Sequence, residues 1–382
     1  MKVVVAIDSL KGSLTSMEAG EAIEEGIHLV DPTIEVVVKP LADGGEGTVA
    51  ALVNGLHGKL KQVQVTGPLK EKIDSQYGII EDKQLAIMEM ASVAGITLVP
   101  EEKRNPYYTT TYGLGEMIKD AIDNGCRNFI IGIGGSATND GGIGMLQALG
   151  FDLLDHNNQP ISLGAIGLKD LVKIDDQNVI SGLSECQFNI ACDVINPLCG
   201  KNGASYIFGP QKGANFEMVV ELDNWLDHFS KIVKNKYPDS DPNYPGTGAA
   251  GGLGFAFLTF TNAKLESGIK LVLEAIDLAS ELQDANLVIT GEGCLDYQTA
   301  MGKAPIGVSK LAKQYCKPVI ALAGSVTPEA RACNQAGIDA YFPIVRKLTT
   351  LQEAMNKENA WNNMVETVEQ IFRLLKIKIG EK

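Results

Sequence analysis

Short apolar runs, each followed by a turn and a helical pattern, recur along the chain. After the first run, Thr15 and Glu18 have capping-box spacing, and apolar Ala19, Ile23 and Ile27 then fall on one helical face. Uninterrupted runs of this length are typical of strands buried in a parallel sheet. Strands that alternate with helices therefore indicate an α/β fold with a Rossmann-like, mostly parallel sheet. The runs expected to form its strands are 2–8, 35–43, 128–134, 286–290, 318–323 and 340–345.

Two regions break this rhythm. Residues 58–100 alternate apolar and polar positions in three short stretches, which is typical of antiparallel strands with one solvated face. Residues 182–280 combine a strand at 187–193 with loops rich in glycine and proline. We expect these two regions to form a second, mixed α/β domain inserted into the first. The expected Rossmann-like domain comprises 1–57, 101–181 and 281–382, and the inserted domain comprises 58–100 and 182–280.

Composition narrows the class of protein. The 382 residues carry a formal net charge of −14, which disfavours binding to nucleic acid or to an anionic membrane surface. The first apolar run is too short for a signal peptide, and the longest uncharged stretch, 246–263, is too rich in glycine for a spanning helix. The seven cysteines contain no CxxC pair, so we expect reduced thiols in a cytoplasmic protein whose partners are small molecules. An oligomer is possible, but the sequence does not predict one.

The segment IGIGGSATNDGG (131–142) follows a predicted strand and opens a helix. This arrangement presents backbone N–H groups and the positive end of a helix dipole to a phosphate. The alternative is a tight strand-to-helix turn without a ligand. The chain contains no GxxxxGK[ST] loop, and its GxGxxG match at 246–251 lacks the preceding strand of a dinucleotide site. The residues expected to bind phosphate are Gly134, Gly135, Ser136, Ala137, Thr138 and Asn139.

Acidic side chains stand at the predicted carboxyl ends of several strands. Asp8, Asp43 and Glu292 follow three runs of the α/β pattern. Ligands of open α/β sheets bind in the crevice at this edge, and carboxylates there can hold Mg²⁺ beside a phosphate. The alternative is that each acid caps the helix that follows it.

Three further segments carry candidate chemistry. Lys11, on the first strand-to-helix loop, can serve as a point charge for a phosphate or a carboxylate. Asp193 ends an apolar strand, where a carboxylate needs a partner or a ligand. The loop 291–305 contains Asp296 and Lys303 among mixed polar groups, and such loops at strand ends are often functional.

Eight motifs, in order along most of the chain, resemble those of the bacterial glycerate kinase family of the glyoxylate- and glucarate-pathway type (type I). They are DSLKGSLTS (8–16), PLADGGEGT (40–48), TTTYGLGE (109–116), IGIGGSATNDGG (131–142), ACDVINPLCG (191–200), FGPQKGA (208–214), GTGAAGGLGFA (246–256) and TGEGCLDYQTAMGKAP (290–305). The resemblance implies a two-domain α/β kinase that transfers the γ-phosphoryl group of ATP to D-glycerate with Mg²⁺. Transfer would be direct and in line, in a cleft between the domains, and the resemblance favours the 2-hydroxyl.

Taken with the residue patterns, the resemblance implies roles for individual side chains. We expect Lys11, Asp193 and Asp296 to be catalytic, Asp8, Ser9 and Lys303 to bind substrate, and Asp43 and Glu292 to hold the metal. A carboxylate must accept the proton of the attacking hydroxyl, since the protein otherwise supplies mainly positioning and charge stabilisation. Asp193 is favoured as this base and Asp296 is the alternative.

Two other classes of protein explain less of the sequence. A nicotinamide-dependent hydroxy-acid dehydrogenase would need GxGxxG at the first strand turn, where DSLKGS stands instead. A non-catalytic sugar-acid sensor would need a DNA-binding or partner module, and no basic helix-turn-helix pattern is present.

Overall fold

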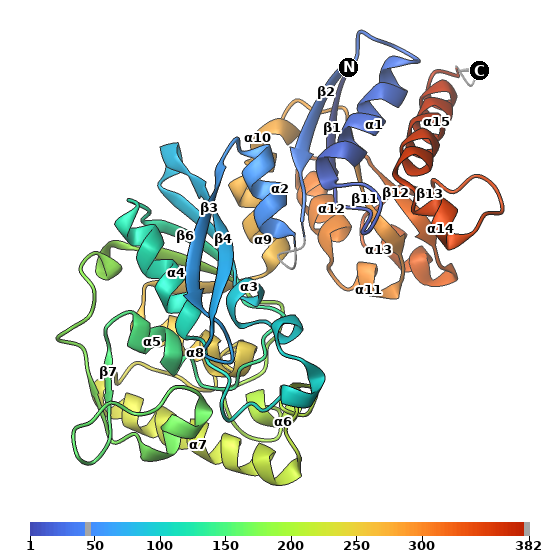
Figure 1. The fold of residues 1–382 in the computed structure, drawn as a ribbon. Coiled ribbons are helices and arrows are strands. Elements are labelled where there is room, and N and C mark those ends of the chain that lie inside the picture. The colour runs from blue at the N-terminus through green and yellow to red at the C-terminus, as the bar shows by residue number, and fades with distance from the viewer. Residues whose placement is uncertain (43–46, 378–382) are drawn as a thin grey trace. The chain divides into compact units, whose positions relative to one another are not determined.

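The computed structural model describes residues 1–42 and 47–377 (Figure 1). The described residues divide into two compact units. The first unit contains residues 1–42, 50–56 and 272–377, and the second contains residues 47–49 and 57–271.

The first unit is built on a parallel sheet with the strand order β13-β12-β11-β1-β2. Its strands are β1 (Lys2–Ile7), β2 (Glu35–Pro40), β11 (Leu287–Leu295), β12 (Val319–Val326) and β13 (Ala340–Pro343). Counted within this unit the order is 2-1-3-4-5, which is that of a doubly wound α/β fold. Successive strands are added toward one edge of the sheet from β1 to β2 and toward the other edge from β11 to β13. The carboxyl ends of β1 and β11 therefore flank the switch point, where such folds bind ligands. The α/β fold class expected from the sequence is confirmed.

Helices cover the sheet of the first unit. They are α1 (Ser16–His28), α10 (Leu278–Leu282), α11 (Tyr297–Ala300), α12 (Ala304–Gln314), α13 (Arg331–Gln335), α14 (Leu351–Ala354) and α15 (Lys357–Leu375). Val3, Val5 and Ile7 pack in one apolar cluster with residues of α1 and α15, and the alternation of a strand directs Val4 and Ala6 to the opposite face. The predicted capping box starts α1, because the Thr15 side chain accepts from the N–H of Glu18 while the Glu18 carboxylate accepts from the N–H of Thr15.

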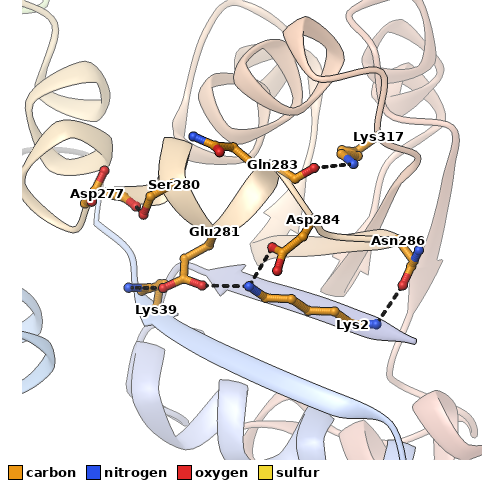
Figure 2. A network of polar contacts seen from close by, with 9 residues as sticks. All are labelled: Lys2, Lys39, Asp277, Ser280, Glu281, Gln283, Asp284, Asn286 and Lys317. Atoms are coloured by element: carbon orange, nitrogen blue, oxygen red, sulfur yellow. Dashed lines mark hydrogen bonds and ion pairs between the residues drawn. The ribbon is translucent and has the colours of Figure 1, made fainter.

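A polar network ties α10 and the turn before β11 to β1 and β2 (Figure 2). The Lys2 ammonium lies 3.0 Å from Glu281 Oε2 and 2.7 Å from Asp284 Oδ1, and its backbone N–H donates to Asn286 Oδ1 at 2.7 Å. Lys39 reaches the other oxygen of Glu281 at 2.9 Å. Since the Lys2 side chain is covered while that of Asp284 is exposed, the network lies at the surface of this unit.

The second unit contains a mixed sheet with the order β10-β9-β6-β5-β4-β3. Its strands are β3 (Lys59–Thr66), β4 (Lys72–Ile80), β5 (Leu85–Glu89), β6 (Asn128–Gly132), β9 (Gln187–Ala191) and β10 (Ala263–Glu266). β3, β4 and β5 pair antiparallel, as their alternating pattern predicted, whereas β5, β6, β9 and β10 are parallel. The carboxyl ends of the parallel strands therefore meet at one edge of this sheet.

The helices of the second unit enclose a separate apolar core. They are α3 (Ala91–Ala94), α4 (Tyr112–Asp123), α5 (Ile143–Ala148), α6 (Ala204–Phe208), α7 (Phe216–Lys236) and α8 (Ala249–Phe260), while β7 (Asp152–Leu154) and β8 (Lys173–Asp175) form a small antiparallel pair. Helix α2 (Thr48–Gly55) and helix α9 (Gly268–Ala275) stand where the chain passes between the units. Among the described helices, none combines the length and apolar composition needed to cross a membrane.

The units divide the chain differently from the expected domains at residues 101–181. The expected assignment grouped this segment with the first strand of the chain, but β6 pairs with β5 and β9, and the whole segment lies in the second unit. An apolar run shows that a strand is buried without showing which sheet receives it, because parallel pairing depends on contacts distant in sequence. The division thus places the loop after β6 in a different unit from Asp8 and Glu292.

Candidate active site

At the switch point of the first unit, the loop after β1 runs directly along β11. The Asp8 N–H donates to the carbonyl of Gly291 at 2.9 Å, and the Asp8 carboxylate accepts from the Ser9 N–H at 2.7 Å. Asp8 is buried, whereas Lys11 is exposed at the tip of the loop. The structure therefore brings Asp8, Ser9 and Lys11 to the edge where a ligand of this fold is expected.

A second group of predicted residues gathers at the start of α11 in the same unit. Asp296 caps α11 by accepting from the Thr299 N–H at 2.9 Å, and the Thr299 hydroxyl contacts both Glu292 Oε1 and the Asp296 carboxylate. The Lys303 ammonium lies 4.0 Å from Asp296 Oδ1. Burial acts to raise the pKa of Asp296, but the hydrogen bond from Thr299 and the charge of Lys303 outweigh it, so the pKa lies below its usual value. Glu292, Asp296 and Lys303 thus form one cluster, with Asp296 ionised near neutral pH.

In the second unit, three carbonyls of the predicted phosphate loop are held by partners outside the loop. The carbonyl of Gly135 accepts from the Ile96 N–H at 2.8 Å, that of Ala137 from the Thr109 hydroxyl at 2.9 Å, and that of Thr138 from the Lys212 ammonium at 2.6 Å. These contacts fix the backbone of the loop at three points.

The exposed part of the loop is its beginning. Gly134 and Gly135 are exposed, and in the described part of the chain no group accepts from their N–H groups. Gly135 has φ +70°, a conformation that side chains other than glycine rarely adopt. The beginning of the loop therefore offers unpaired N–H groups to an anion.

The later part of the loop is buried. Thr138, Asn139 and Asp140 are fully buried and Ser136 is nearly so, and Asn139 donates to Ser205 Oγ at 2.9 Å. The sequence analysis expected the side chains of Thr138 and Asn139 to reach a phosphate. In the structure they lie in the interior of the unit. Their burial favours a role in holding the loop.

Asp140 anchors the end of the loop. Its carboxylate accepts from the Thr111 N–H and the Thr111 hydroxyl, both at 2.9 Å, and from the Gly142 N–H at 3.1 Å. Burial raises the pKa of Asp140, and the hydrogen bonds from Thr111 and Gly142 oppose this shift without cancelling it. Asp140 thereby connects the loop to the first residues of both α4 and α5.

Lys212 is a residue of this site that sequence reasoning missed. Its side chain is 2% exposed, and its ammonium donates to Ser136 Oγ at 2.8 Å as well as to the carbonyl of Thr138. Burial lowers the pKa of Lys212 to about 7, while the nearby charge of Asp140 acts in the opposite direction. The only signal was its place in FGPQKGA (208–214), because nothing in the sequence shows that this lysine contacts Ser136 and Thr138, which lie 76 and 74 residues earlier.

Asp193 follows β9, the strand beside β6, so it lies at the same sheet edge as the phosphate loop. Its Oδ1 accepts from the Gly268 N–H at the start of α9, at 3.1 Å. Glu89 ends β5 on the other side of β6 and accepts from the Val49 N–H at 2.9 Å. The sequence analysis singled out Asp193 and did not consider Glu89, which lies in one of the alternating stretches of residues 58–100.

The glycine-rich segment 246–256 packs against the phosphate loop. The Gly141 N–H donates to the carbonyl of Gly251 at 2.9 Å, and a Cβ atom at Gly251 would lie 2.2 Å from the carbonyl oxygen of Thr138. Gly251 also has φ +70°, so a side chain is excluded here on two grounds. The GxGxxG match therefore supports the loop from behind.

A magnesium site was predicted from Asp43 and Glu292. Asp43 lies outside the described residues, and within 1–42 and 47–377 no group of three or more His, Cys, Asp or Glu side chains is arranged to hold a metal. Mg²⁺ in phosphoryl-transfer sites is commonly held by one or two carboxylates together with substrate phosphates. Glu292, which lies at the switch point beside Asp296, fits that arrangement.

Comparisons with known proteins agree with this geometry. The model of the glycerate kinase family matches residues 3–376. A glycerate kinase of Haemophilus influenzae is 48% identical over 99% of this chain and 100% of its own length, and a glycerate 2-kinase of Escherichia coli is 47% identical over 99% and 98%. A crystal structure from Salmonella typhimurium LT2, provisionally described as a glycerate kinase 2, superimposes with a TM-score of 0.91 at 45% identity and covers 98% of both chains. The chain belongs to the glycerate kinase family.

Proposed function

We propose that the protein is a glycerate kinase, which transfers the γ-phosphoryl group of ATP to a hydroxyl group of D-glycerate. The observation that carries the proposal is family membership over residues 3–376, with relatives named glycerate kinases at nearly half identity over their full length. The geometry supports it independently, because each unit presents polar groups at the carboxyl edge of its parallel strands.

In the second unit, the loop after β6 is proposed to bind phosphate oxygens. The N–H groups of Gly134 and Gly135 are available to an anion, and Ser136 lies behind them in contact with Lys212. Donors held rigidly before the substrate arrives stabilise developing charge without reorganising during the reaction. Ala137, Thr138 and Asn139 contribute by fixing the backbone of the loop.

In the first unit, Lys11 and Lys303 are proposed to supply the positive charges that the anionic substrates require. Asp8 and Ser9 share the loop of Lys11, and Asp296 lies next to Lys303. Glu292 is proposed to hold Mg²⁺ together with nucleotide phosphates. When bound, the ion neutralises charge on the phosphate oxygens and polarises the phosphoryl group.

Two carboxylates remain candidates for the base. Asp296 serves as a helix cap and has a pKa below its usual value, so it is a weak proton acceptor suited to holding charge. Asp193 is exposed at the edge beside the phosphate loop, where it accepts from the Gly268 N–H. We therefore assign the proton-accepting role to Asp193 and the charge-holding role to Asp296.

The test is release of ADP that depends on D-glycerate, followed by phosphorus NMR of the product. We expect 2-phosphoglycerate, the regiochemistry stated in the name of the Escherichia coli relative. A 3-phosphoglycerate product would leave the kinase proposal intact and overturn the regiochemistry. Oxidation of glycerate with a change in NAD(P)H absorbance, and without ADP release, would contradict the proposal itself.

We propose that the enzyme acts in the cytoplasm. All seven cysteines, which lie within the described residues, are unpaired thiols. Burial raises the pKa of Cys126, Cys186 and Cys199, so these thiols are poor nucleophiles in a reducing compartment.

A further inference from the structure

We propose that Lys212 is a positioning residue that places a buried positive charge beneath loop 134–140, and that an anion bound at this loop is accompanied by uptake of a proton by Lys212. This inference rests on the proposed function, since it concerns the loop assigned there to phosphate binding.

The geometry gives Lys212 a direct hold on the loop. Its ammonium donates to the hydroxyl of Ser136 at 2.8 Å and to the carbonyl of Thr138 at 2.6 Å. These two residues directly flank Ala137. The side chain is 2% exposed, so its charge is screened little by water. Because the N–H groups of Gly134 and Gly135 are exposed just before Ser136, an anion bound to them would come close to this charge.

The charges around Lys212 leave its protonation sensitive to a ligand. Asp140 is the acidic group whose charge acts on it, and the pKa of Lys212 nevertheless falls to about 7 because burial outweighs that charge. Arg104 is the charged residue whose backbone lies against Gly213, next to Lys212, and Glu101, Glu102 and Lys103 precede it on the same segment. A bound anion adds a second negative charge, which favours the protonated amine and raises the pKa of Lys212. Above pH 7, binding must then draw a proton from solvent.

Proton uptake separates this role from a purely structural one. A neutral lysine amine can still donate two hydrogen bonds, so a lysine that only clamps the loop would not change protonation when the anion binds. A lysine that also supplies charge must change protonation above pH 7. The two roles therefore differ in proton exchange even if they share the same contacts.

The experiment is titration calorimetry of the full chain with sulfate, which does not itself titrate in this range, at pH 8 in two buffers of different ionisation enthalpy. The wild-type protein is expected to take up a proton fraction approaching one per sulfate. Lys212→Met should bind sulfate at least about tenfold more weakly and without uptake. Lys212→Arg keeps a charge that does not titrate, so it should bind without uptake. Lys234→Met is the matched control, since Lys234 is an exposed lysine of the same unit that also donates to a backbone carbonyl, and it should behave as wild type.

Several outcomes would overturn the proposal. They are sulfate binding without proton uptake in wild type, uptake that persists in Lys212→Arg or Lys212→Met, and no binding of sulfate at all. If neither variant folds, carbon NMR of labelled lysine in the wild-type protein is the test. The proposal requires one lysine that titrates near pH 7 and whose pKa rises when sulfate is added. The readout does not involve turnover, so a protein that binds sulfate as described but releases no ADP would contradict the proposed kinase activity alone.

Discussion

The phosphate loop of the second unit and the switch-point loops of the first unit hold their polar groups in opposite ways. In loop 134–140 the carbonyls of Gly135, Ala137 and Thr138 are bound from outside the loop. Asp140 is fully buried, and the Lys212 ammonium contacts the backbone of the loop. At the switch point Lys11 is exposed, and the side chains of Asp296 and Lys303 are each about one third exposed and 4.0 Å apart.

This difference separates two requirements of phosphoryl transfer. A loop whose later residues are buried and whose carbonyls are bound by neighbouring segments has its geometry fixed before the substrate arrives, which is what stabilisation of a developing charge requires. Lys11 is exposed and Lys303 is partly exposed, so both can move, which suits groups that follow a nucleotide or a metal ion during a reaction. Changes in the first unit's loops should therefore affect catalysis more than folding, and changes in the second unit's loop should affect both.

The largest effect expected is loss of the base. Asp193→Asn keeps an oxygen that can accept from the Gly268 N–H, so the fold should persist while kcat falls by about 10²–10⁴ at every Mg²⁺ concentration. Asp296→Asn should instead raise the Mg²⁺ requirement, and added Mg²⁺ should restore part of the activity. Initial rates against Mg²⁺ concentration distinguish the two variants.

The opposite pattern would exchange the two roles. If the Mg²⁺ rescue occurs in Asp193→Asn and not in Asp296→Asn, then Asp296 is the base. Normal turnover by both variants would remove both carboxylates from the transfer centre, and Asp8 and Glu292 would become the candidates to test next.

The second effect concerns stability. Asp140→Asn places an amide N–H₂ against donors from Thr111 or Gly142, so we expect the second unit to lose about 3 kcal/mol of unfolding free energy. The chain has two tryptophans, Trp225 in the second unit and Trp361 in the first. Urea unfolding in a Trp361→Phe background therefore reports the second unit through Trp225.

The control for this measurement is Asp123→Asn. Asp123 lies at the end of α4 in the same unit and is exposed, so its replacement should leave the Trp225 transition nearly unchanged. An equal effect of both variants would mean that burial of Asp140 does not matter for folding, contrary to the comparison of the two loops.

How much of this the sequence predicted depends on whether the signal was local. The capping box at Thr15 and the strand-end positions of Asp8 and Asp193 were predictable, because each follows from a few adjacent residues. The sheet that contains β6, and the position of Lys212 under the phosphate loop, depend on pairing and packing between segments far apart in sequence. The burial of Thr138 was missed for the same reason, because a polar residue in a glycine loop is equally compatible with a ligand and with an interior contact.

A moderate effect is expected at Lys11. Since Lys11 is exposed at the tip of its loop, Lys11→Met should leave the Trp361 unfolding transition almost unchanged. Activity should fall by at least about tenfold, equivalent to ~1.4 kcal/mol of transition-state stabilisation. Steady-state kinetics with varied D-glycerate and ATP measure the loss, and a fully active variant would count against placing Lys11 at the site.

The smallest effect is expected in the surface network of Figure 2. Lys2→Met removes the ion pairs with Glu281 and Asp284 but keeps an apolar side chain of similar length on β1. Asp284 is exposed and Glu281 is partly exposed and keeps Lys39 as a partner, so water and salt screen these ion pairs and the first unit should lose less than about 1 kcal/mol. Trp361 fluorescence in a Trp225→Phe background measures the change, and it should shrink further in concentrated salt. A loss as large as that expected for Asp140→Asn would show that the first unit depends on fixed charges as strongly as the second, and the contrast between the two units would then fail.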